Sequence, residues 1–145
     1  MYCSLFRGYK QDRGSIVGAV VALENYLKTM KNPERNVLAP ARRRAKWFMK
    51  TLRSIPDSEF RILDSTVEGV DPLKIALMIT LTQKTPEEVK KLRDDLMSGE
   101  PEIWIETKDN SFIINITSFR GLMMFDEADS RIVARRLIQT LRRRK

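Results

Sequence analysis

The segment from Ser15 to about Lys31 constrains the fold more than any other, because a helix formed here would have no polar side. Its run from Ile16 to Leu23 (IVGAVVAL) places apolar side chains nearly all round the helix. Such a helix must be covered on several sides, and a chain of 145 residues has little material to cover it. We therefore expect it to pack against something larger, either a second subunit in a homo-oligomer or a further part of the same protein.

A second helix is predicted from Val37 to Ser54, after a turn over residues 32–36. Apolar residues recur at helical spacing along one side, and basic residues lie on the other. Trp47 falls off the apolar stripe, so we expect it to meet a partner. Residues 1–55 are thus predicted to form a basic link followed by a two-helix arm. The apolar stripe consists of Leu38, Ala41, Ala45, Phe48, Met49, Leu52 and Ile55, and the basic side of Arg42, Arg43, Lys46, Lys50 and Arg53.

From Pro56 onward the pattern changes to strand, strand, helix, strand, strand, helix. Thr85 and Glu88 form a capping box at the start of the first of these helices, with Pro86 in its first turn. Residues 56–145 are therefore predicted to be a small α+β sandwich domain. It would have an antiparallel or mixed sheet of about four strands, with helices packed on one face. Strands are expected at 59–66, 73–82, 102–107 and 111–116, and the last helix begins near Asp126.

The composition excludes several kinds of chemistry. The chain has no His, which removes Ser–His–Asp and Cys–His catalysis. With Cys3 as its one cysteine, the chain has no disulfide framework and no Cys-cluster metal site, so no metal ligands are assigned.

The sequence also bears on where the protein is located. The N-terminus lacks the layout of a secretory signal, and no apolar run reaches the ~18 residues of a membrane span. We expect a cytoplasmic protein that does not enter membranes.

The net charge of +8 is unevenly distributed. Residues 1–53 carry +9, residues 54–130 carry −8 and residues 131–145 carry +7. The two basic regions lie on the polar sides of predicted helices, where solvated cations are common. Phosphate-backbone contact is the alternative interpretation, and it predicts a stand-alone nucleic-acid-binding module. The acids Asp126, Glu127 and Asp129 begin the last helix and are assigned to capping.

Several stretches resemble one known family. Residues 7–18 (RGYKQDRGSIVG) and 22–27 (ALENYL) are similar to a basic link and the helix that follows it in selenocysteine-synthase-like enzymes. Residues 99–105 (GEPEIWI) are similar to their G-[DE]-P-x-I-x-[VA] entry to a hairpin, and residues 132–137 (IVARRL) to their closing helix. These enzymes, related to L-seryl-tRNA(Sec) selenium transferase, depend on pyridoxal phosphate (PLP) and have the aspartate-aminotransferase fold (fold type I).

The resemblance covers only the C-terminal small domain of such an enzyme. It implies that the Schiff-base lysine, the aspartate that pairs with the pyridine nitrogen and the phosphate-binding loop belong to a large domain outside this chain. PLP is implied for the parent enzyme, which would use it as an electron sink. No catalytic or cofactor-binding residue is assigned here, and the chain is expected to be inactive alone. The implied partner is that large domain or a second subunit.

The resemblance also places basic residues near an active site. Arg7, Lys10 and Arg13 would lie beside it, although a solvated basic link is an equal interpretation of these three residues. The family has D-x-R-T-L after its second hairpin strand, whereas this chain has Asn115-Ile116-Thr117-Ser118-Phe119. Thr117 therefore stands where the family has arginine. Arg120, three residues further on, is the candidate to replace it.

Overall fold

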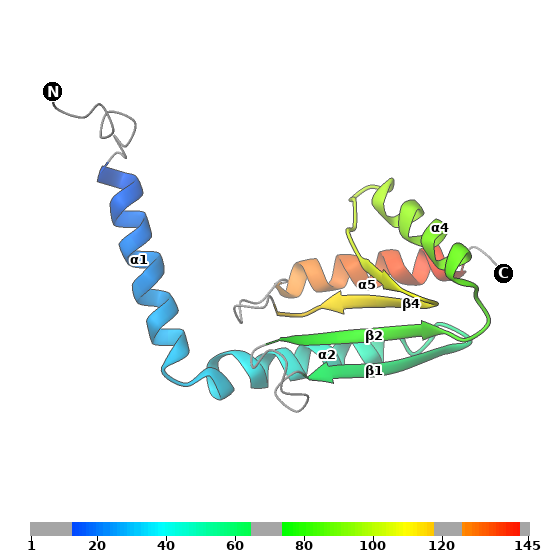
Figure 1. Ribbon diagram of the computed structural model, residues 1–145, viewed down its shortest axis with the longest axis horizontal. Coiled ribbons are helices and arrows are strands. Elements are labelled where there is room, and N and C mark those ends of the chain that lie inside the picture. The colour runs from blue at the N-terminus through cyan, green and yellow to red at the C-terminus, as the bar shows by residue number, and fades with distance from the viewer. Residues whose placement is uncertain (1–12, 65–73, 118–125, 143–145) are drawn as a thin grey trace, which may run out of the picture.

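The computed structural model describes residues 13–64, 74–117 and 126–142 (Figure 1). From residue 56 onward, the described elements follow the predicted order of strand, strand, helix, strand, strand, helix, and the fold is α+β. A π-helix immediately precedes the second α-helix. The elements are α1 (Arg13–Met30), η2 (Glu34–Leu38), α2 (Ala39–Leu52), β1 (Ser58–Asp64), β2 (Ile75–Leu81), α4 (Pro86–Met97), β3 (Glu106–Lys108), β4 (Ser111–Asn115) and α5 (Glu127–Arg142).

The four strands form one antiparallel sheet in the order β1-β2-β4-β3. In β2, Leu77 and Ile79 are fully buried, whereas Met78 and Thr80 between them are only half-buried. This alternation has the period of two expected for a sheet covered on one face. Helices α2, α4 and α5 cover that face, and their apolar residues join those of the sheet in one core. The predicted class, strand number and one-sided helix layer are confirmed.

Helix α2 belongs to this core. Ala41, Ala45, Phe48 and Leu52 follow one another at helical spacing and are all fully buried. Of the two helices assigned to the N-terminal arm, only α1 therefore stands clear of the core. Figure 1 shows α1 projecting from the body, which it joins through η2. The division of the chain at residue 55 stays a prediction, but α2 packs with the sheet that follows it.

The structure corrects the boundaries of several predicted elements. The expected turn at 32–36 is in part helical, because η2 begins at Glu34 and buries Val37 and Leu38 against the core. The expected strand at 102–107 is ordered as a strand only over Glu106–Lys108. In the preceding segment, the Ile103 N–H donates to the Leu96 carbonyl of α4 at 3.0 Å and not to a neighbouring strand. Part of the expected strand at 59–66 lies outside the described residues.

Local hydrogen bonds fix the start of α4. The Thr85 hydroxyl accepts from the Glu88 N–H, and the Glu88 carboxylate accepts from the Thr85 N–H at 2.8 Å. The predicted capping box is thus confirmed. The bond from the Thr85 N–H, supported by Lys84, lowers the pKa of Glu88 below its usual value. At the start of α5, the Asp126 carboxylate accepts from the Asp129 N–H at 2.7 Å, so Asp126 acts as the predicted cap.

Candidate functional site

Most of the site residues assigned by resemblance lie outside the residues that the structure describes. Arg7, Lys10 and Arg120 lie outside the described residues. Arg13 is the first residue of α1, and only its backbone is described. The structure therefore does not test whether these four side chains lie together, and their role stays a prediction.

Thr117, which the sequence resemblance aligns with an arginine, forms hydrogen bonds within the sheet. It is fully buried, and its hydroxyl accepts a hydrogen bond from the Ile75 N–H at 2.7 Å. Its own N–H donates to the Ile75 carbonyl at 3.1 Å. The second residue after β4 is thereby tied to the first residue of β2, 42 positions earlier in the chain. Thr117 therefore joins the end of the β4 segment to the start of β2, and its buried hydroxyl oxygen accepts a backbone hydrogen bond.

The largest unpartnered surface in the described part of the chain is α1. Its big apolar side chains are between 38% and 60% exposed and lie on more than one side of the helix. Gly18, near the N-terminal end of this surface, has no atom within 4 Å of where a Cβ would be, apart from its chain neighbours and the nearby backbone of its own helix. The predicted all-round apolar helix is confirmed, and within the described structure nothing covers it. The exposed side chains are Ile16, Val17, Val20, Val21, Leu23, Tyr26 and Leu27.

The basic residues of α2 form two groups: arginines that bond to other parts of the fold, and cations that are exposed to solvent. Arg42 is 2.6 Å from both Glu34 and Asp64, and the hydrogen bond to Asp64 is the main reason that its pKa is raised. Arg44 reaches α5, where its Nη1 donates to the Asp126 carbonyl and to the Ser130 hydroxyl, each at 2.6 Å. These two arginines hold the fold together. The cations left on the solvent side of α2 are Arg43, Lys46, Lys50 and Arg53.

The basic side of α5 divides in the same way. Arg131 pairs with Glu127 one turn earlier, and both are well exposed. Arg136, predicted to lie on the solvated side, is instead half-buried, and its Nε is buried without a hydrogen-bond partner. Its guanidinium lies over Gly99, where a Cβ would be 1.5 Å from Nη2. The glycine that ends the α4 segment therefore also makes room for Arg136.

Trp47 is partly buried where α2 meets α5. Its ring packs edge-on against that of Phe48, with centroids 5.1 Å apart and planes at 75°. Two neighbouring hollows of about 350 and 270 Å³ lie along this seam, and Trp47 lines both. Trp47, which the helical spacing places off the apolar stripe, is partly buried against the core cluster and also lines these two hollows.

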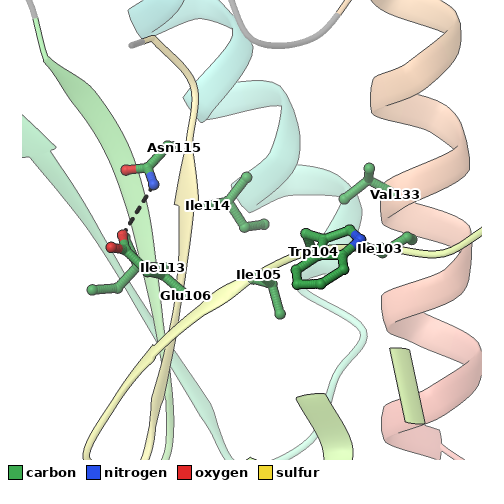
Figure 2. Close-up of a pocket in the computed structure, with 8 residues that line it drawn as sticks. All are labelled: Ile103, Trp104, Ile105, Glu106, Ile113, Ile114, Asn115 and Val133. Carbon is green, nitrogen blue, oxygen red and sulfur yellow. Dashed lines mark hydrogen bonds between the residues drawn. The ribbon is translucent and has the colours of Figure 1, made fainter. Parts of the chain in front are cut away.

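A further hollow of about 370 Å³ lies at the edge of the sheet (Figure 2). Strand β3 begins at Glu106, opposite Ile113, and the residues just before it border a gap beside Ile114. Trp104, 75% exposed, lies across this gap between Ile114 and Val133. Sequence reasoning did not single out Trp104, although its place between two isoleucines in an alternating run indicates an outward-facing aromatic ring.

The described residues do not fit PLP. An aldimine-forming lysine is usually held in a desolvated pocket, but every described lysine is exposed or half-buried. Within the described ranges no group of three or more Cys, Asp or Glu is placed to hold a metal ion. In the same ranges no helix combines the length and apolarity needed to cross a membrane. The features that remain are surfaces: the bare helix α1, the α2–α5 seam and the hollow at Trp104.

Comparison with known proteins returned no match, either to a family model or to a curated protein.

Proposed function

We propose that this chain is the C-terminal small domain of a cytoplasmic, PLP-dependent enzyme related to selenocysteine synthase, and that it assembles through α1. The observation that carries this proposal is the uncovered apolar surface of α1. The sequence resemblance puts this same helix between the small domain, the large domain and the partner subunit. The large domain would bind PLP, which supplies an electron sink for amino-acid substrates.

The exposure of α1 supports assembly on more than one side. Ile16, Val20 and Leu27 expose about half of their surface, and Val17 and Leu23 nearly three-fifths. Covering the exposed part of one such side chain contributes about 1 kcal/mol. Six aliphatic side chains of this kind supply a driving force on the order of 6 kcal/mol before the cost of association. Because they lie on several sides of the helix, one neighbour would cover only part of them.

The proposed role of this chain is to complete an active site and not to hold the cofactor. The described residues do not fit PLP, so no reaction step is derived for them. The α+β body would present α1 to the large domain, while the sheet and its helix layer keep that presentation rigid. Thr117 is proposed to stabilise the sheet where the family uses an arginine, so any positive charge required at that place must come from another residue.

Co-expression tests this proposal. The full chain is produced together with the separately encoded large domain of a selenocysteine-synthase-like enzyme that lacks its own small domain. We expect the two to co-purify, and Val20→Glu/Leu27→Glu to abolish the association without unfolding the body. The matched control is Lys90→Glu on α4, which leaves association unchanged. A chain that stays separate, or a variant pair that associates as well as the parent, would refute the role of α1.

PLP binding by the isolated chain provides a second test. We expect no stoichiometric imine absorbance when PLP is added, and no lysine modified after borohydride treatment. Trapping of PLP at a single lysine would contradict the placement of the cofactor on another domain. This measurement is independent of whether α1 associates with anything.

A stand-alone nucleic-acid-binding module is the second candidate function. The exposed cations of α2, among them Arg43, Lys46 and Lys50, favour it. Arg42 and Arg44 weigh against it because their guanidinium groups are engaged within the fold. Titration of a generic oligonucleotide at two salt concentrations distinguishes the candidates. Binding through phosphates must weaken steeply as salt rises.

A further inference from the structure

Two hollows that share Trp47 follow one another along the seam between α2 and α5, and together they form a groove on this surface. The two helices run side by side in the same direction (Figure 1). One hollow is lined by Pro40 of α2 and Glu127 of α5, and the next by Thr51 and Gln139, further along each helix. From Pro40 to Thr51, α2 rises about 16 Å at 1.5 Å per residue. The groove is therefore about three helical turns long.

The floor of this groove is apolar and preformed. Trp47 lies at its middle, and its ring is held edge-on by the fully buried Phe48. Ala134 and Ile138 of α5 complete the hollow beyond Trp47. Because the tryptophan is already ordered by the core, an apolar side chain entering here would not incur the cost of ordering it.

The rims of the groove are cationic on both sides. Arg43 of α2 and Arg135 of α5 are exposed and form no ion pair with any described residue. Arg131 also lies on the rim, paired with Glu127, and Glu127 is the one acidic side chain among the described residues that line the two hollows. The long stems of such arginines can cover apolar surface while their charged ends stay in water. A ligand that fits must combine an apolar stripe with acidic flanks.

We propose that the α2–α5 groove binds an acidic amphipathic helix of a partner protein. Apolar residues spaced i, i+4 and i+7 would lie along a groove of three turns, with one of them against Trp47. Glutamates or aspartates on both sides of that stripe would meet Arg43 on one rim and Arg135 on the other. Single-stranded nucleic acid fits less well, because base stacking needs an open aromatic face and Trp47 is partly buried in an apolar floor. The inference does not depend on the proposed PLP-related function.

The test uses the full chain carrying Trp104→Phe, so that Trp47 is the one remaining indole of the two in the sequence. Three probes are added in turn. The first is a synthetic 18-residue helical peptide with leucines at i, i+4 and i+7 and flanking glutamates. The second is the same peptide with lysines in place of the glutamates, and the third is a 15-nucleotide single strand.

We expect the glutamate peptide to shift Trp47 fluorescence saturably and the lysine peptide to have no effect. Arg43→Glu/Arg135→Glu should weaken glutamate-peptide binding about tenfold or more, since each substitution replaces an attraction by a repulsion. The same variant should gain affinity for the lysine peptide. Lys90→Glu/Lys91→Glu, an equal charge change on exposed residues of α4, is the matched control and should leave binding unchanged.

Three results would overturn the proposal. The first is equal binding of the two peptides, or of neither. The second is glutamate-peptide binding that the Arg43→Glu/Arg135→Glu change does not affect. The third is saturable binding of the oligonucleotide when the glutamate peptide does not bind. If the Arg43→Glu/Arg135→Glu variant also loses this oligonucleotide binding, the groove would be assigned to nucleic acid.

Discussion

Replacing Thr117 by valine tests the assignment of this residue to the sheet. The change keeps the shape of the side chain but removes the oxygen that accepts from the Ile75 N–H at 2.7 Å. Both residues are fully buried, so the N–H loses its partner where water cannot replace it. Leaving such a group unpaired costs about 1–3 kcal/mol, and the added methyl group offsets up to ~0.8 kcal/mol. The net expectation is a loss of about 1–2 kcal/mol in the free energy of unfolding.

Thermal unfolding and amide hydrogen exchange measure this effect. For a chain of 145 residues, 1 kcal/mol lowers the melting temperature by about 3 °C, so a decrease of about 3–6 °C is expected. Thr117→Ser is the matched control, because it keeps the oxygen and loses only a methyl group. In the valine variant, hydrogen exchange of the Ile75 amide should accelerate by more than the loss of global stability alone would cause. In the serine variant, no such extra acceleration is expected. An unchanged melting temperature with a protected Ile75 amide in Thr117→Val would refute the reasoning.

Three further predictions concern other contacts. Phe48→Ala should cost about 3–5 kcal/mol of unfolding free energy, because it empties the core behind α2; a smaller loss in chemical denaturation would mean that the helix layer collapses to fill the space. Since the folded-state pKa of Glu88 is below its usual value of 4.5, ionised Glu88 stabilises the fold above that pH and loses this effect as pH falls through the folded pKa. Melting curves of Glu88→Gln and the parent chain should therefore converge in acid, and parallel pH profiles would contradict the capping role. Gly99→Ala should displace the Arg136 guanidinium, which a structure of the variant would reveal, and an unmoved Arg136 would show that the loop yields instead.

Helices and caps could be predicted from the sequence because their causes are local. The apolar stripe of α4 and the Thr85–Glu88 capping box act over three or four residues, so spacing alone located them. The helix layer on one face of the sheet was predicted from the order of elements along the chain. Strand ends were less accurate. Strand β3 starts only at Glu106, and the Ile103 N–H before it donates to Leu96 at the end of α4, a contact that the strand's own composition does not indicate.

The roles of individual polar residues could not be predicted, because their partners are distant in sequence. Arg44 donates to Ser130, 86 residues later, and Thr117 accepts from Ile75, 42 residues earlier. In the sequence, Arg42, Arg43 and Arg44 form one basic cluster. In the structure, Arg43 is the exposed one of the three, and it forms no ion pair with a described residue. The residues assigned to an active site by resemblance largely lie outside the described ranges, so their placement rests on the resemblance.

The sequence by itself determined that residues 16–23 form a helix with no polar side, and from this it predicts a partner that covers the helix. It did so because side-chain periodicity in a helix is independent of the rest of the fold. Only the tertiary structure decided that α2 joins the core, that α1 alone stays uncovered, and that Trp47 lies in a cation-rimmed groove. Those outcomes depend on which segments the sheet topology brings together, and residues as far apart as Arg43 and Arg135 share a surface only after the chain has folded.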